Sequence, residues 1–444
     1  MKKSIDDIEV RGKRVLVRLD LNVPLDDQSR ITDDRRITAA LPTLKKIRKG
    51  GGRLVLMSHL GRPKGRPGDR EKFSLAPVAV RLGELLDCPV PLVRGEVAAV
   101  EEGVAVSAGP RGLKPAAQGS KKPAAQGAGK PATWGAEASA AWPDAEVVLL
   151  ENLRFHQAET IKDAQAAKDA SLRTQKDAFA RGLADMADVY VNDAFGTCHR
   201  DNASMLTVPQ MMVGKPRVVG LLVRKELRFL GEALADPKRP FACLLGGAKV
   251  SDKLGVIQAL LGRCDTILIG GAMAYTFLAA KGESVGRSLV EADLLATARS
   301  LIAEAGDRLV LPTDSVCARE MAPNAVNEVH SGGIPTDLMG LDIGPHSVEH
   351  FAKLIGSAKT VVWNGPMGVF EMPPFDRGTV AMAEALAEAT DRGAVSIVGG
   401  GDSSAAVDRA GVADRLSHIS TGGGASLEFL EGKPFAALEV LDDA

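Results

Sequence analysis

Three short glycine clusters stand where an apolar run gives way to a helical pattern. They are Gly246-Gly247, Gly399-Gly400-Gly401 and Gly422-Gly423-Gly424. Glycine lets the backbone turn sharply and approach a ligand closely, and the unpaired N–H groups at the start of the following helix attract phosphate. One such cluster is often only a tight turn. Three in the second half of the chain, the first followed by Lys249 and Lys253, indicate phosphate binding.

The two commonest nucleotide-binding motifs are missing from the sequence. No G-x-x-x-x-G-K-[ST] occurs, which excludes a P-loop enzyme. No G-x-G-x-x-G follows an early apolar run, which disfavours a dinucleotide-binding fold in its usual form. The glycine clusters therefore indicate phosphate binding by another strand–turn–helix arrangement.

Arginine residues of the first half gather at the ends of apolar runs and at turns. Arginine is the side chain best suited to capture carboxylate or phosphate through two parallel hydrogen bonds. A single one would more often form a surface ion pair. Together with Asp20 and Asn22, which end the first apolar run, they indicate a basic anion pocket. The residues are Arg36, Arg62, Arg154 and Arg200, with His59 and His199 beside two of them.

The size and charge of the chain limit what it can be. Its 444 residues are too many for one hydrophobic core, so two domains are expected. A net charge of −1 argues against a dedicated nucleic-acid or membrane-surface protein. Residues 1–100 nevertheless carry 21 lysines and arginines against 13 aspartates and glutamates, so the first part of the chain is basic and the remainder net acidic.

Cysteine usage and the N-terminus favour a cytoplasmic protein. The five cysteines are far apart and form no C-x-x-C pair, which is typical of a reduced protein without a disulfide framework. The start MKKSIDDIEV lacks the apolar stretch of a secretory signal. No run approaches the roughly 18–20 apolar residues that cross a bilayer. Together with the net charge of −1, this means that neither a membrane nor a nucleic acid is expected as a partner.

The elements that must position these residues are nine short apolar runs separated by segments with helical spacing. Such strands alternating with helices are typical of parallel sheets covered on both faces, and nine of them fit two doubly wound sheets better than one. Ligands of such sheets bind at the carboxyl ends of the strands, where Asn152, Asp193, Asn364 and Asp402 stand. The runs are 14–22, 53–61, 147–155, 189–196, 241–247, 266–271, 308–314, 360–366 and 395–401.

Two segments differ from this alternation. A domain boundary is expected near 205–219. The segment VPQMMVGKPRVVG (208–220) contains two prolines and two glycines before the amphipathic pattern LLVRKELRFLGEAL, and is interpreted as a hinge that leads into an interdomain helix. Residues 96–145 include KPAAQG twice, at 114–119 and 122–127. Pro, Gly, Ala and Gln without apolar periodicity predict disorder over about 106–142, in a tolerated surface insertion rather than a docking tail.

Nine motifs, in order along the chain, resemble phosphoglycerate kinase. They cover nearly the whole sequence outside the 96–145 insertion, and so many long matches in order are very specific. The motifs are LDLNVP (19–24), SHLGRP (58–63), LLENLRF (149–155), NDAFGTCHR (192–200), GGAKVSDK (246–253), GLDIGP (340–345), WNGPMGVFE (363–371), GGGDSSAA (399–406) and STGGGASLEFLEGK (420–433).

The resemblance implies two Rossmann-like α/β domains with doubly wound parallel sheets, joined by a hinge helix. Residues 1–210 would form an N-terminal domain that binds 3-phosphoglycerate, and 211–424 a C-terminal domain that binds the nucleotide. Residues 425–444 would return to the N-terminal domain. The implied activity is glycolytic and reversible: 1,3-bisphosphoglycerate and ADP give 3-phosphoglycerate and ATP, with Mg²⁺, in a hinge-bending monomer.

The resemblance also implies a set of site residues. The acid substrate, 3-phosphoglycerate or 1,3-bisphosphoglycerate, would be held by Asp20, Leu21, Asn22, Arg36, His59, Leu60, Gly61, Arg62, Arg154 and Arg200. ATP or ADP would be held by Lys249, Lys253, Gly271, Gly340, Asn364, Pro366, Glu371, Gly400, Gly401, Asp402 and Ser403, with Asp402 next to Mg²⁺. Arg36, Lys249, Gly400 and Gly423 would act on the transferring group itself.

Some positions depart from the family pattern. Ala272 stands where a third glycine is usual, which bears on the adenine pocket, and His346 stands where lysine is common. The sequence around Arg200 is less usual, and the 96–145 insertion replaces a short helix. None of these departures removes a residue that the chemistry needs.

The residues suit a transfer between two anions. A carboxylate and a β-phosphate oxygen are both ionised at pH 7, so no general base is required, and catalysis should rest on positioning and charge stabilisation. Two other functions remain open from the residues alone. One is a non-catalytic binding or scaffold protein, which intact Arg36, Lys249, Lys253 and Asp402 disfavour. The other is a different α/β enzyme such as a dehydrogenase, which the missing dinucleotide motif disfavours.

Overall fold

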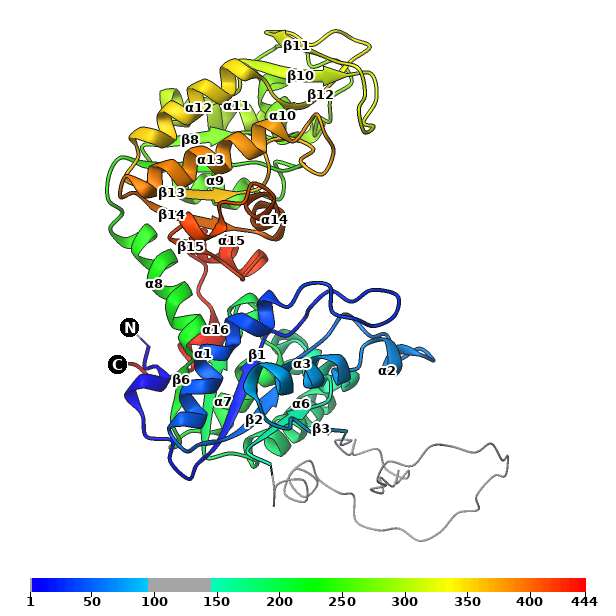
Figure 1. The fold of residues 1–444 in the computed structure, drawn as a ribbon, viewed down its shortest axis with the longest axis vertical. Helices are drawn as coiled ribbons and strands as arrows, with labels where there is room; N and C mark the ends of the chain where they lie inside the picture. Colours follow the sequence, from blue (N-terminus) through cyan, green and yellow to red (C-terminus); the bar gives the residue numbers. More distant parts are fainter. Residues whose placement is uncertain (1, 95–144) are drawn as a thin grey trace. The chain divides into compact units, whose positions relative to one another are not determined.

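The computed structural model describes residues 2–94 and 145–444, and the chain folds into two compact units (Figure 1). The first unit is Met1–Arg224 with Phe435–Ala444, and the second is Lys225–Pro434. The stretch 106–142, for which disorder was expected, lies outside the described residues, as does nearly all of the predicted insertion.

The first unit is built on a parallel sheet of six strands in the order β3-β4-β2-β1-β5-β6. Central β1 pairs on both sides, so that Val17 lies opposite Leu56 of β2 and Val191 of β5. The strands are β1 (Arg14–Leu19), β2 (Arg53–Met57), β3 (Leu92–Val93), β4 (Val147–Leu150), β5 (Val189–Asp193) and β6 (Arg217–Val219).

Helices cover this sheet because alternate strand residues point to opposite faces. Val15 and Val17 pack in one core with Leu44 of α1 and Leu82 of α3. The helices are α1 (Arg35–Lys49), α2 (Asp69–Lys72), α3 (Ala76–Leu86), α5 (Asp163–Ala166), α6 (Ala170–Ala184), α7 (Val208–Met211) and α16 (Ala436–Glu439). Short turns η1 (Ile5–Asp7), η2 (Leu153–Phe155), η3 (Gln157–Thr160), η4 (Phe195–Thr197) and the π-helical η5 (Ala203–Thr207) complete it.

The second unit repeats the plan with a sheet in the order β15-β14-β13-β7-β8-β9, again parallel. A second, antiparallel sheet in the order β11-β10-β12 was not foreseen from the sequence. The strands are β7 (Phe241–Leu245), β8 (Thr266–Ile269), β9 (Leu309–Val310), β10 (Asp314–Ala318), β11 (Asn327–Ser331), β12 (Met339–Ile343), β13 (Thr360–Asn364), β14 (Val395–Gly399) and β15 (His418–Ile419).

The core of the second unit lies between its parallel sheet and a helical layer in which α12 and α13 lie side by side (Figure 1). Trp363 and Val361 of β13 pack with Phe351 of α12 and Leu386 of α13. The helices are α9 (Leu254–Leu261), α10 (Met273–Ala280), α11 (Leu295–Ala305), α12 (Pro345–Ser357), α13 (Arg377–Asp391), α14 (Gly401–Arg409) and α15 (Gly424–Leu430), with turns η6 (Ala292–Leu294), η7 (Gly306–Arg308) and η8 (Ala413–Arg415).

Two parallel-sheet units flanked by helices confirm the predicted fold class, and each of the nine predicted runs contains a strand. The structure places the segment 205–219 differently from its interpretation as a hinge. It forms η5, α7 and β6 inside the first unit, because most of its apolar side chains are buried and β6 pairs with β5. The chain passes into the second unit within helix α8 (Leu221–Ala235), after Arg224.

The end of the chain returns to the first unit from Phe435 onwards. Asp442 accepts from the backbone and guanidinium of Arg217, and Lys2 bridges to Asp443, so the two termini lie side by side (Figure 1). Within the part of the chain that the structure describes, no helix has both the length and the apolar character needed to cross a bilayer.

Candidate active site

The carboxyl ends of β1 and β2 bring three of the predicted acid-site residues together. Asp20 follows β1 and forms an ion pair with Arg36 in the first turn of α1. His59 follows β2, is 3% exposed, and places Nε2 4.0 Å from Oδ1 of Asp20. Parallel neighbours end at the same edge of the sheet, which is why residues 39 positions apart in sequence meet here.

A second group is tied to this edge through Gly61. The Asn22 side-chain oxygen accepts from the Gly61 N–H at 2.7 Å, and Arg154 donates to the Gly61 carbonyl at 2.6 Å. Gly61 has φ +59°, and a Cβ there would lie 2.4 Å from the ring of Phe73. Both the left-handed backbone and the close ring require glycine at this position.

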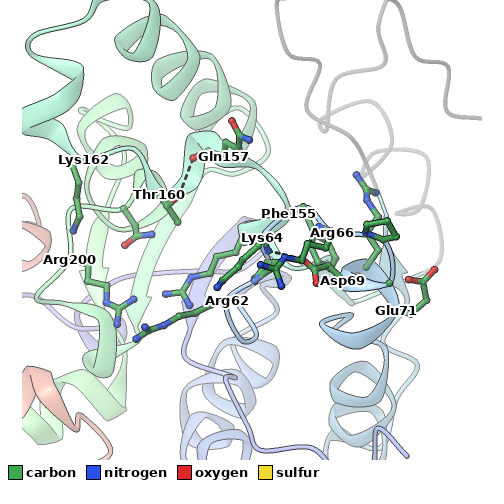
Figure 2. A pocket seen from close by; sticks show the side chains of 17 residues that line it. Arg62, Lys64, Arg66, Asp69, Glu71, Phe155, Gln157, Thr160, Lys162 and Arg200 are labelled. Carbon is green, nitrogen blue, oxygen red and sulfur yellow. Dashed lines mark hydrogen bonds between the residues drawn. The ribbon is translucent and has the colours of Figure 1, made fainter. Parts of the chain in front are cut away.

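A cavity of about 930 Å³ opens beside these residues in the first unit (Figure 2). Arg62, Arg154 and Arg200, all predicted from the sequence, line it, and Figure 2 shows the side chains of Arg62 and Arg200 entering the same part of the cavity. Its charged lining residues are mostly cations: Arg62, Lys64, Arg66, Arg70, Arg154, Lys162 and Arg200 against Asp69 and Glu71. Such a lining attracts a multiply charged anion.

The pKa values of the titratable groups at this site also reflect an excess of positive charge. Burial, followed by repulsion from Arg200 and Arg18, lowers the pKa of Arg154 to about 10. Burial and then Arg200 lower the pKa of His199 to about 4. The pKa of His59 lies well below its ordinary value, chiefly because the ring is buried and then because arginines surround it. Both histidines are therefore neutral at pH 7, and the charge of the site comes from its arginines.

Two predicted acid-site residues have side chains in the core instead. Leu21 and Leu60 belong to the buried cluster of the first unit and are 0% and 3% exposed. Their backbones are held by hydrogen bonds, with the Leu21 N–H donating to Ser58 Oγ at 2.9 Å and the Leu60 carbonyl accepting from Asn152 at 2.7 Å. Any contact of these residues with a ligand would be through the main chain.

In the second unit, Lys253 and Asn364 meet at the end of β13. The Lys253 ammonium donates to the Asn364 side-chain oxygen, and burial lowers the pKa of that ammonium. The Asn364 Nδ2 atom is buried and has no hydrogen-bond partner among the described residues. A Cβ on Gly400 would lie 3.2 Å from this atom, so the amide adjoins the glycine turn after β14. A buried donor without a partner is costly unless a ligand satisfies it.

The same turn begins helix α14. Gly400 has φ +96°, and no side chain caps the first N–H groups of the helix. Asp402 and Ser403 lie in the first turn, where Ser403 Oγ accepts from the Gly365 N–H at 2.6 Å. The first-turn N–H groups at a helix N-terminus form a ready anion site. Asp402 is exposed, so its carboxylate can reach a cation carried by such an anion.

Gly271 and Pro366 lie beside the first glycine cluster. The Gly271 N–H donates to the Met367 carbonyl at 2.8 Å, and the Gly247 N–H donates to the Pro366 carbonyl at 3.0 Å. Gly271 has φ +67°, and a Cβ there would lie 2.5 Å from Gly247 N and 2.8 Å from Pro366 O. Two backbone segments thus approach one another at a point where a side chain has no room.

Replacing Gly271 by alanine should therefore destabilise the protein by about 1–3 kcal/mol, because backbone atoms must shift to admit the methyl group. Because Gly271 and Pro366 are both among the residues predicted to bind a nucleotide, the displaced backbone should weaken that predicted binding as well. Thermal unfolding and steady-state kinetics measure the two effects. Gly282→Ala is the control: Gly282 has φ +90° but no atom within 4 Å of a Cβ, so it reports the backbone strain alone. Equal losses in both variants would contradict the steric argument.

Four other predicted residues of the second unit have fewer contacts that tie them to the rest of the predicted site. Gly340 donates its N–H to Ser288 at 2.9 Å, and a Cβ there would overlap the Tyr275 ring. Lys249 is exposed between β7 and α9, and Glu371 is exposed in the turn after Phe370. Gly423 precedes α15 with φ +52°. All four residues lie in the second unit, and no hydrogen bond links any two of them.

Sequence reasoning missed Arg18 and Ser58, which hold the acid-site edge from inside the sheet. Arg18 is 1% exposed in β1 and contacts His59, and Ser58 Oγ donates to the Leu19 carbonyl at 2.8 Å. The available signal was a charged residue within the apolar run RVLVRL. A buried charge is retained only when it is paired or hydrogen-bonded, so it points to a structured network.

Three comparisons with known proteins agree with one another. The family model described as phosphoglycerate kinase matches residues 5–109 and 129–433. A phosphoglycerate kinase of Rhodopirellula baltica is 51% identical over 448 residues and one of Chlorobium phaeobacteroides 48%, each alignment covering 100% of both chains. The solved phosphoglycerate kinase of Coxiella burnetii has a TM-score of 0.78 at 35% identity, and that of Pyrococcus horikoshii 0.76 at 29%, each covering 99% of this chain and 98% of the other.

Proposed function

The chain belongs to the phosphoglycerate kinase family, and we propose that it binds its acid substrate on the first unit and its nucleotide on the second. The reaction is reversible glycolytic phosphoryl transfer between 1,3-bisphosphoglycerate and ADP, giving 3-phosphoglycerate and ATP. The chain is accordingly a transferase.

In the proposed acid site, charge complementarity selects the ligand. Arg62, Arg154 and Arg200 would bind the phosphate of 3-phosphoglycerate within the basic cavity, by the bidentate contacts that arginine makes. Asp20, Asn22 and His59 would bind the hydroxyl and carboxylate at the strand ends. Leu21, Leu60 and Gly61 would contribute main-chain atoms. The basic cavity lined by Arg62, Arg154 and Arg200 is the observation that carries this assignment.

In the proposed nucleotide site, glycine turns and Lys253 surround the phosphates. The unpartnered Asn364 amide and the first turn of α14, Gly401–Ser403, would donate to phosphate oxygens. Gly271, Gly340 and Pro366 would border the base, and Glu371 would bind the ribose. Ala272 opens α10 from the same turn, so its methyl group is the feature expected to reshape the adenine pocket.

Magnesium is proposed to accompany the nucleotide. Among the described residues no cluster of three or more His, Cys, Asp or Glu side chains could hold a metal by itself. One carboxylate fits Mg²⁺, which is usually bound through one or two carboxylates and the substrate phosphates. Asp402 would hold the ion there, and the ion would neutralise phosphate charge.

Transfer is proposed to be direct and in line. A carboxylate oxygen of 3-phosphoglycerate forms a bond to the γ-phosphorus while the bond from that phosphorus to the ADP oxygen breaks; the reverse reaction makes ATP. Both nucleophiles are already anions, so the work of the protein is to align them and to stabilise the charge of the transferring group. Arg36, Lys249 and the N–H groups of the Gly400 and Gly423 turns are proposed to contact that group.

Direct transfer between ligands on two units requires the units to close, which also excludes water. Small-angle scattering should therefore show a smaller radius of gyration with 3-phosphoglycerate and Mg-ATP together than with either alone, and a mass that corresponds to a monomer. The same profile under all three conditions would contradict closure. A non-hydrolysable ATP analogue is the control that separates closure from turnover.

The direct test of the proposed function is ATP-dependent phosphorylation of 3-phosphoglycerate by the purified full chain with Mg²⁺, coupled to reduction of the product. Turnover that requires both substrates and Mg²⁺ is expected. Binding of both ligands without turnover would instead favour a non-catalytic member of the family. Localisation in the cytoplasm is proposed as well, and fractionation of the producing cell tests it.

A further inference from the structure

Arg18 lies inside the sheet beneath the acid site. It is 1% exposed, and its guanidinium makes three hydrogen bonds within the first unit. Nε donates to Ser204 Oγ at 2.9 Å, Nη1 donates to the Leu19 carbonyl, and Nη2 lies 3.1 Å from His59 Nδ1. Arg18 is not among the residues that line the cavity, so a charge buried this deeply is expected to act through its neighbours.

Ser204 is in turn fixed by a buried carboxylate. Glu159, which is 0% exposed, accepts from the Ser204 hydroxyl at 2.7 Å and from the Ser204 N–H at 2.9 Å. Tyr190 adds a bond from its hydroxyl to the Ser204 carbonyl at 2.9 Å. The serine hydrogen is thus directed to Glu159 and its lone pair to Arg18. These hydrogen bonds hold the Arg18 guanidinium in one orientation.

Hydrogen-bond direction at His59 follows from the chemistry of arginine. A guanidinium has five N–H donors, no acceptor, and does not deprotonate in proteins. His59 Nδ1 must therefore be the acceptor in its contact with Arg18, which leaves the ring proton on Nε2. Nε2 lies 4.0 Å from Asp20 Oδ1, beyond hydrogen-bond distance, so Asp20 does not take up this proton.

The charged groups around the ring keep it neutral. An imidazolium would place an N–H against the Arg18 N–H and add a cation to a site that is already basic. The pKa of His59 is lowered well below its ordinary value, first by burial and then by these arginines. The charged groups that face His59 come from several elements. They are Arg18 in β1, Asp20 directly after β1, Arg36 in α1, Arg154 in η2, and Arg200.

We propose that Arg18 is a positioning residue that holds His59 as the neutral Nε2–H tautomer, so that His59 donates a hydrogen bond from Nε2 to the anionic acid substrate. Arg18, Ser204 and Glu159 form the support for this donor. The identity of the substrate rests on the proposed function, whereas the tautomer is a property of the free protein. His59 neither adds a charge to the site nor acts as an acid or base, and it remains a donor throughout pH 6–8.

The tautomer is measured directly by ¹⁵N NMR of the full-length protein with labelled histidine. The His59→Gln spectrum identifies the His59 signals. We expect an Nδ1 signal of the unprotonated, acceptor type and an Nε2 signal of the protonated type, unchanged between pH 6 and 8. A proton on Nδ1, or a doubly protonated ring at pH 7, would overturn the proposal. This result does not depend on turnover, so it stands even if the protein proves not to phosphorylate 3-phosphoglycerate.

Two matched substitutions test the donor itself. The amide nitrogen of glutamine takes the place of Nε2 and that of asparagine the place of Nδ1. His59→Asn should raise the KM for 3-phosphoglycerate about tenfold more than His59→Gln, as expected for the loss of one hydrogen bond to an anion. The KM for ATP should stay the same in both. Equal KM values for 3-phosphoglycerate in the two variants would contradict donation from Nε2.

The support is tested by Arg18→Met, with Ser204→Ala as the milder variant. Without the guanidinium, both His59 tautomers should appear in the ¹⁵N spectrum and the KM for 3-phosphoglycerate should rise about threefold to tenfold. Arg18→Lys, which keeps a donor, should restore the Nε2–H tautomer. A single Nε2–H tautomer in Arg18→Met would show that Arg18 does not position the ring. Should Arg18→Met fail to fold, the ¹⁵N spectra of Ser204→Ala and of the unchanged protein still test whether the His59 ring is held as the Nε2–H tautomer.

Discussion

Replacing Arg36 by methionine is expected to lower kcat for phosphoryl transfer by on the order of 10²–10³, as the loss of one preorganised donor to a developing anion does elsewhere. Arg36 lies in the first turn of α1, where its pair with Asp20 directs the guanidinium to the ends of β1 and β2. The side chain is half-buried, so its charge is less screened than at an open surface. We expect the KM for 3-phosphoglycerate to rise much less than kcat falls, because the charge that Arg36 stabilises is greatest during transfer.

Arg35→Met is the matched control, since Arg35 is the neighbouring residue of α1, is exposed, and pairs with Asp33. Its kcat should stay within about twofold of the unchanged protein, because exposed ion pairs contribute little. Circular dichroism and thermal unfolding check that both variants fold. Near-normal turnover of Arg36→Met, or a similar loss in Arg35→Met, would remove Arg36 from the transferring group.

The strands were predictable because their signal is local. Val15, Val17 and Leu19 lie in an apolar run that ends in Asp20, and a run of that kind reads as a buried parallel strand whatever its neighbours are. The antiparallel sheet was missed for the same reason. β11, Asn327–Ser331, is largely exposed and carries little apolar pattern, so only its pairing with β10 defines it as a strand.

The hinge was misplaced because turn residues describe local conformation and not the division between two cores. Prolines and glycines within 208–220 suggested a linker, yet Val208, Val218 and Val219 are buried in the first unit. The apolar side chains, rather than the prolines, decide where such a segment packs. The division within α8 has no turn signal at all, because a helix continues through it.

For the candidate site, residue types were predictable and the pairings between residues were not. Arg62, Arg154 and Arg200 could be grouped by type and strand-end position, and they line one cavity. The bond from Arg18 of β1 to His59, which follows β2, depends on the register of these two strands, and no single-sequence pattern contains that register. The sequence therefore predicted which groups would bind an anion, and the fold supplied the groups that orient them.

Replacing Lys249 by methionine is expected to lower kcat by on the order of 10²–10³ with little change in stability. Lys249 follows the Gly246-Gly247 turn after β7, and its exposed ammonium is proposed to neutralise the transferring phosphoryl group. Lys253 differs, because it is buried against Asn364 and its loss would disturb the fold as well as the site. An exposed position leaves the stability within about 0.5 kcal/mol, so the kinetic effect of Lys249→Met can be interpreted without correction.

Lys281→Met is the matched control, because Lys281 is also an exposed lysine of the second unit and pairs with Glu283 at 3.4 Å. Its kcat should remain near that of the unchanged protein. Single-turnover experiments locate the effect of Lys249→Met: a slow chemical step with ordinary ATP binding places the charge on the transferring group. A normal chemical step with a raised KM for ATP would instead make Lys249 a residue of nucleotide binding only. Because its side chain is exposed while that of Arg36 is anchored to Asp20, Lys249 is the one of the two whose effect should decrease at high salt.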